Sequence, residues 1–208
     1  MPRSSTTSRH AAATLAVLLL VACGKKDQAA ADSAAGASAA ATVAPAPMPA
    51  DTAKPAAALN DAQIAHVVVT ANAIDSAAGA LAKSKGTAKA VKDFGQTMVT
   101  DHGGVNKQAV ALVTKLKVTP EDNDVSRGLK SGGDQNMSTL QGLSGAAFDS
   151  AYIAHEVDYH QAVLDALDKT LIPGAQNAEL KALLEKSRPA FVAHLDRAKT
   201  VQTGLGKK

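Results

Sequence analysis

The chain is poor in cysteine and in aromatic side chains. Its 208 residues include one cysteine, no tryptophan, three phenylalanines and two tyrosines. One cysteine excludes an intramolecular disulfide framework and any zinc or iron–sulfur site built from several thiolates. Few aromatics leave no stacking platform for single strands, and a net charge of +3 is too small for a clustered basic surface. We therefore expect no nucleic-acid partner.

The apolar run near the start of the chain is too short to span a bilayer. This run, at 11–22, is shorter than the roughly 20 residues that a transmembrane helix needs. Arg3 and Arg9 precede the run without any acid, and the run ends at Ala22. This pattern predicts a signal peptide over residues 1–22.

The only cysteine, Cys23, directly follows this segment. The junction resembles the lipobox of bacterial lipoproteins, which implies cleavage before Cys23 and acylation of its thiol and new amine. Two or three acyl chains give a stable membrane anchor. No acid follows Cys23 directly, so in a cell with two membranes we expect the outer membrane, with the protein facing the periplasm. The alternative is a plain signal peptide with an incidental cysteine.

Residues 23–58 are expected to form a disordered tether behind the lipidated cysteine. They are rich in alanine and contain Pro45, Pro47, Pro49 and Pro55, which block a continuous helix. Without large apolar side chains such a segment cannot bury a core and acts as a linker.

Residues 59–205 carry apolar residues at helical spacing and no sustained alternation. Asn60 and Gln63 resemble a capping box, Thr87 is a plausible N-cap, and Pro120 suits a first helical position. Pro189 is expected to kink or split the last helix. The first expected helix starts at Asn60, and the other four cover residues 87–116, 121–142, 147–171 and 177–204. Short breaks favour antiparallel packing, so we predict an all-α antiparallel four-helix bundle with an additional or kinked C-terminal helix.

Three expected helices each place a histidine on the apolar stripe: His102, His160 and His194. Asp101 and Glu156 accompany them, and Asp75 flanks the stripe of the first helix. Imidazole and carboxylate groups inside a bundle can hold one transition-metal ion, such as iron, copper, zinc or manganese. The alternative, which we favour at this point, is a structural cluster in which each buried histidine is satisfied by a hydrogen bond.

A rise of roughly 1.5 Å per residue gives the expected heights of these residues in an antiparallel bundle. His102 and His194 fall at about the same height, His160 about two turns away, and Glu156 in between. Asp75 falls on the other side, about 9 Å off. The best-placed candidate set is therefore His102 and His194 with Asp101 or Glu156, followed by His160.

Three motifs resemble a bacterial family known as domain of unknown function 4142. They are residues 91–102 (VKDFGQTMVTDH), residues 148–153 (FDSAYI) with His160 downstream, and Pro189 with His194 and Leu195. The resemblance implies a ferritin-like helical bundle that is exported and associated with the outer membrane. Its histidines match His102, His160 and His194, and its acids match Asp101 and Asp149.

The chain departs from the family pattern at two places. Gly95 stands where the family usually has alanine. Members often carry a glutamate near Ala77, where the nearest acid here is Asp75. The chain also has no Glu-x-x-His, which ferritin-type di-iron centres require, so we expect no ferroxidase activity.

No catalytic motif of a common hydrolase or nucleotide-binding enzyme is present in the sequence. The leading interpretation is a non-enzymatic, lipid-anchored envelope protein that binds a protein partner or supports the envelope. The alternative is mononuclear metal binding, for metal handling or as an oxidoreductase. A small apolar ligand between the helices is disfavoured because the small side chains at 77–80 favour close packing.

Overall fold

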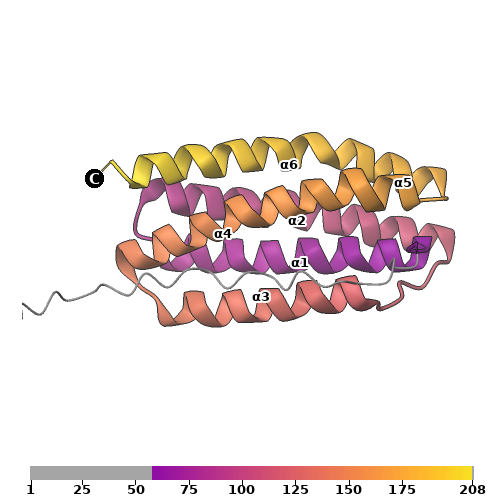
Figure 1. The fold of residues 1–208 in the computed structure, drawn as a ribbon, viewed down its shortest axis with the longest axis horizontal. Coiled ribbons are helices and arrows are strands. Elements are labelled where there is room, and N and C mark those ends of the chain that lie inside the picture. The colour runs from indigo at the N-terminus through magenta and orange to yellow at the C-terminus, as the bar shows by residue number, and fades with distance from the viewer. Residues whose placement is uncertain (1–57, 208) are drawn as a thin grey trace, which may run out of the picture. The chain divides into compact units, whose positions relative to one another are not determined.

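The computed structural model describes residues 58–207, and every regular element in this range is helical (Figure 1). The predicted all-α class is therefore confirmed. The predicted signal peptide, Cys23 and the tether up to residue 57 lie outside the described residues. The elements are α1 (Asp61–Lys85), α2 (Lys89–Leu116), α3 (Asp124–Gly142), α4 (Gly145–Ala166), the π-helical turn η1 (Leu167–Leu171), α5 (Ile172–Gly174) and α6 (Ala178–Leu205).

The long helices pack in two main pairs, α1 with α2 and α4 with α6. Helix α2 also contacts α6, α1 contacts α4, and α3 lies along α1 (Figure 1). Helix α1 is long and apolar enough to cross a membrane, but such a helix is also typical of a soluble core, and ten of its residues are buried in the fold.

The buried apolar residues form two clusters with polar residues between them. One cluster contains Phe94, Met98, Phe148, Tyr152 and Ile153, and the other contains Ile64, Leu164, Leu171, Leu184 and Phe191. Along α1, α2 and α4, buried polar side chains lie between the two clusters, and on α6 His194 lies between Phe191 and Leu195, close to where the cluster that contains Phe94 begins at Ala198. The fold thus has a polar layer at mid-length whose side chains are buried, and buried polar groups need partners.

Helices α1 and α2 cross at two glycines, Gly79 and Gly95. A Cβ atom on Gly95 would lie 2.6 Å from the Gly79 carbonyl oxygen, and one on Gly79 would lie 2.7 Å from the Met98 Cβ. The close crossing therefore depends on the absence of both side chains. Of the predicted close-packed residues 77–80, Ala78 and Gly79 are buried, whereas Ala77 and Ala80 are exposed.

The helix ends agree with only some of the predicted caps. Asn60 and Gln63 form the predicted capping box of α1. Thr87, however, is not the N-cap of α2, which is Ala88 without a side-chain cap. The Asp149 carboxylate of α4 instead accepts hydrogen bonds from the Thr87 and Ala88 amides, at 2.9 and 2.7 Å, and from the Thr87 hydroxyl. A residue from another helix caps α2, which the local sequence does not show.

The later helix boundaries also differ from the predicted ones. Pro120 lies in a loop, because Asn123 caps α3 and the helix begins at Asp124. The helical path of α4 continues through η1 to Gly174, past the predicted end at residue 171. Helix α6 continues through Pro189 and is not split in two.

Candidate metal centre

The polar layer brings together five ionisable side chains from four helices. Asp75 comes from α1, His102 from α2, Glu156 and His160 from α4, and His194 from α6; each is at most 6% exposed. The ring centroids of the three histidines lie 5.1–5.5 Å apart. We call these five residues the histidine cluster.

One ring nitrogen of His102, Nδ1, is hydrogen-bonded to an amide. In each ring of the cluster we call the nitrogen held by such a hydrogen bond the outer nitrogen, and the other one the inner nitrogen. His102 Nδ1 lies 2.9 Å from Asn72 Oδ1, while Asn72 Nδ2 donates to the Val68 carbonyl oxygen at 2.8 Å. With its nitrogen donating to Val68, the Asn72 side chain presents its oxygen to the ring. Since this oxygen can only accept, His102 carries a proton on Nδ1 and leaves Nε2 without one in the neutral ring.

The other two rings are held in the same manner. His160 Nδ1 donates to the Glu156 carbonyl oxygen at 2.9 Å. His194 Nε2 donates to Asp101 Oδ2 at 2.9 Å. Acceptors on the outer nitrogens fix both the tautomer and the orientation of a ring, as they do for histidines that bind metals.

The inner nitrogens of the three rings are His102 Nε2, His160 Nε2 and His194 Nδ1. Among the described residues, none of these buried nitrogens has a hydrogen-bond partner. One nitrogen of each ring lies within 4.8 Å of one from each of the other two. Three imidazole nitrogens this close to one another can bind one cation together when their rings are neutral.

Two carboxyl groups lie beside the histidine rings, Asp75 at inner nitrogens and Glu156 at the outer nitrogen of His160. Asp75 Oδ2 lies 3.0 Å from His102 Nε2 and 3.5 Å from His160 Nε2, yet neither Asp75 oxygen forms a hydrogen bond with a described residue. Glu156 Oε2 lies 3.4 Å from His160 Nδ1 and is likewise unpaired within residues 58–207. Asp75, Glu156 and His160 also offer ligand atoms within 4.8 Å of one another.

The environment separates the two carboxyl groups in their proton affinity. Burial, followed by the charge of Asp75, raises the pKa of Glu156 well above its ordinary value. Burial alone would also raise the pKa of Asp75, but its contact with His102 and the charges of the three histidines outweigh burial and lower it. Without a metal, Asp75 is therefore the ionised member of the pair and Glu156 the protonated one.

Burial lowers the pKa of His194, and the hydrogen bond to Asp101 opposes this shift only in part. The neutral ring is thereby favoured. A neutral imidazole is the form that binds a metal ion.

The structure places two candidate residues closer than the sequence predicts. The His160 ring is 5.5 Å from the His102 ring rather than two turns away, and Asp75, expected about 9 Å off, contacts His102 directly. The estimate from the rise per residue assumes that the helices end at the same height. Tertiary contacts, such as the Gly79–Gly95 crossing and the cap from Asp149, instead determine how far one helix is shifted along another.

Asp101 and Asn72 lie one layer further out. The Asp101 side chain is 42% exposed and contacts His194 Nε2, so it orients the ring and does not face the inner nitrogens. Sequence reasoning missed Asn72. The available signal was its spacing, because Asn72 and Asp75 lie three residues apart and share one face of α1.

The other two histidines among residues 58–207, His66 and His155, are not members of the cluster. His66 Nδ1 is 3.9 Å from Asp122 Oδ1, at the start of the α3 segment. His155 stacks on Tyr159 with ring centroids 5.6 Å apart.

These features define an all-helical protein with a buried cluster of histidines and carboxylates at mid-length. Residues 46–201 match the family model described as Domain of unknown function (DUF4142), and the chain belongs to this family. Comparison with curated proteins and with solved structures finds no match.

Proposed function

We propose that the protein binds one transition-metal ion in the histidine cluster. His102, His160, His194 and Asp75 supply the ligand atoms, Glu156 lies beside them, and the outer acceptors orient the rings. One observation carries this proposal: each ring is hydrogen-bonded at its outer nitrogen and unpaired, among the described residues, at its inner nitrogen.

A purely structural polar cluster would pair its members with one another. A buried polar atom without a partner costs roughly 1–3 kcal/mol, so a fold that needed only packing would satisfy or replace such atoms. Six atoms of the histidine cluster remain unpaired within the described chain. They are His102 Nε2, His160 Nε2, His194 Nδ1, Glu156 Oε2 and both carboxylate oxygens of Asp75. This pattern favours metal binding over the structural interpretation.

The donor set indicates the class of metal. Three imidazole nitrogens with carboxylate oxygens suit iron, manganese, zinc or copper, whereas magnesium and calcium prefer oxygen ligands alone. Ligands from each of α1, α2, α4 and α6 support the proposed ferritin-like four-helix arrangement. Because the chain lacks Glu-x-x-His, the proposal is for one ion and not for a di-iron pair.

We also propose that the domain works at the cell envelope, anchored through lipid on Cys23 and facing the periplasm. The support is the sequence alone: the basic start, the short apolar run and Ala22–Cys23. In membrane fractions, the full chain should float with the lipid and Cys23→Ser should not. Equal flotation of both chains would contradict the anchor.

The metal proposal is tested on the full chain, purified without a polyhistidine tag, by mass spectrometry of its metal content. We expect about one equivalent of a transition metal, and a loss of that metal in His102→Gln. His66→Gln is the matched control, since it removes a histidine outside the cluster and should retain the metal. Circular dichroism checks that both variants fold. No metal as isolated, together with no thermal shift on adding iron, manganese, zinc or copper, would overturn the proposal.

A further inference from the structure

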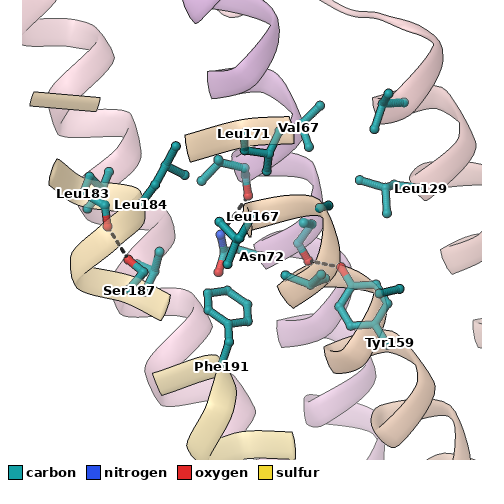
Figure 2. Close-up of a pocket in the computed structure, with 17 residues that line it drawn as sticks. Val67, Asn72, Leu129, Tyr159, Leu167, Leu171, Leu183, Leu184, Ser187 and Phe191 are labelled. Carbon is teal, nitrogen blue, oxygen red and sulfur yellow. Dashed lines mark hydrogen bonds between the residues drawn. The ribbon is translucent and has the colours of Figure 1, made fainter. Parts of the chain in front are cut away.

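A second feature adjoins the histidine cluster: a cavity of about 110 Å³ lined by residues of α1, α2, α3, α4, η1 and α6 (Figure 2). We call it the apolar cavity. Its wall is formed almost entirely by aliphatic side chains and one phenyl ring, among them Val67, Leu129, Leu167, Leu171, Leu184 and Phe191. Residues 77–80 do not line it.

The few polar groups on the wall are already used. The Tyr159 hydroxyl donates to the Ala71 carbonyl oxygen at 2.9 Å, and the Ser187 hydroxyl donates to the Leu183 carbonyl oxygen at 2.8 Å (Figure 2). The Asn72 amide binds the Val68 carbonyl and His102. A water molecule needs two to four polar partners, so this wall suits an apolar occupant.

Two wall residues also belong to the surroundings of the histidine cluster. The Phe191 ring centroid lies 5.1 Å from that of His102 and 6.0 Å from that of His160. Asn72, on the same wall, holds His102 Nδ1. The apolar cavity is therefore separated from the cluster by one layer of side chains.

The outer wall of the cavity is formed by a helix with few buried residues, α3. Helix α3 contributes Val125, which is 41% exposed, and Leu129, which is partly buried. Only Ser126 and Leu140 of this helix are buried among the described residues. A small local displacement of α3 is enough to admit a molecule, because few buried contacts oppose it.

We infer that the apolar cavity binds a small apolar molecule, of about the size of benzene or fluorobenzene, as a substrate or co-substrate of the metal centre. Apolar cavities of comparable size stay dry and take up benzene or xenon. An unfilled cavity destabilises a fold, so an apolar cavity beside a set of unpaired ligand atoms favours a bound molecule. The role as a substrate chamber rests on the proposed function, whereas binding to the cavity does not.

The test uses fluorobenzene as the probe. Its binding to the purified full chain is measured by ¹⁹F NMR, once with metal-free protein and once with Mn²⁺-loaded protein. Wild type should show saturable binding. Ala166→Leu narrows the cavity from α4, and Leu184→Phe narrows it from a buried position on α6. Both should reduce binding at least tenfold. Ala147→Leu on the exposed face of α4 is the matched control and should bind as wild type does.

The manganese-loaded protein reports whether the two sites adjoin. Bound fluorobenzene should relax faster with Mn²⁺ than without metal, and this enhancement should vanish in Leu184→Phe. Absence of saturable binding, or binding that neither cavity variant reduces, would overturn the inference while leaving the metal proposal intact. Binding without faster relaxation in manganese-loaded protein would overturn the substrate role. Fluorobenzene binding by a chain that takes up no metal would overturn the proposed function instead, and with it the substrate role.

Discussion

Asp75 Oδ2 on α1 lies 3.0 Å from His102 Nε2 on α2, and within residues 58–207 neither atom forms a hydrogen bond. Their separation allows a hydrogen bond, but in the neutral ring the hydrogen bond to Asn72 places the proton on Nδ1, the opposite nitrogen. Both atoms therefore present lone pairs to a shared space. A cation placed between them would satisfy the two together.

Asp75→Asn should weaken metal binding by about 100-fold or more, because it removes the negative charge nearest the three rings. This loss should exceed that of any substitution at a residue that holds an outer nitrogen. The amide has nearly the same shape, so the metal-free variant should fold. Competition with a coloured chelator measures the affinity, and circular dichroism checks the fold. An affinity equal to that of wild type would show that Asp75 is no ligand.

Asp101→Asn should weaken metal binding by about 10–100-fold, because Asp101 orients His194 without facing the inner nitrogens. Stoichiometry at saturating metal should stay at that of wild type. Asp93→Asn serves as the control on the same helix, since the Asp93 carboxylate pairs with Lys89 at 2.6 Å. The same chelator competition applies. Equal affinities for all three chains would rule out a positioning role for Asp101.

Glu156→Gln should stabilise the metal-free protein at neutral and alkaline pH. Burial raises the pKa of Glu156 above its ordinary 4.5, so the folded state holds a proton that the unfolded state has released. Wild type therefore loses free energy of unfolding as the pH rises from 4.5 through the raised folded pKa, whereas glutamine has no proton to lose.

The measurement for Glu156→Gln is urea unfolding with a chelator present, at pH values from 4 to 9. The advantage of the variant should be near zero at the acid end and grow with pH. An advantage that shrinks as the pH rises would contradict the raised pKa. With metal present the order should reverse, if the ionised Glu156 contributes to the site.

Gly95→Ala should destabilise the fold by about 1–3 kcal/mol, because the new Cβ meets backbone atoms of α1 that cannot turn aside. Gly104→Ala is the matched control on α2: nothing lies within 4 Å of its Cβ position, so the better helix propensity of alanine should stabilise by about 0.5–1 kcal/mol. Urea unfolding of both variants gives the two signs. A higher free energy of unfolding for Gly95→Ala than for wild type would show that α1 and α2 can move apart without loss of stability.

The existence of the helices could be predicted because their apolar residues recur at helical spacing. The predicted capping box at Asn60 is present for the same reason: both of its partners are local. The boundaries that failed depend on tertiary contacts. Asp149 caps α2 from 61 residues away, and a loop rather than a helix follows Pro120. No local pattern contains that information.

The candidate residues were found by their placement on apolar stripes, but their grouping could not be derived. Asp75 was set too far away, since helix lengths do not fix how far one helix slides along another. Asp101 looked equivalent to Glu156 in sequence, yet one is 42% exposed and the other fully enclosed. The choice between ligand and orienting residue depended on ring orientation, which only coordinates supply.

The depth of the histidine cluster has a kinetic consequence. Its side chains are at most 6% exposed, and the cavity next to it is apolar, so a hydrated ion has no ready path through that wall. Loading and release then require the helices to part, and the exchange rate follows the frequency of that opening. An ion once bound would be retained for far longer than its equilibrium affinity alone suggests, and would dissociate only when the helices open locally.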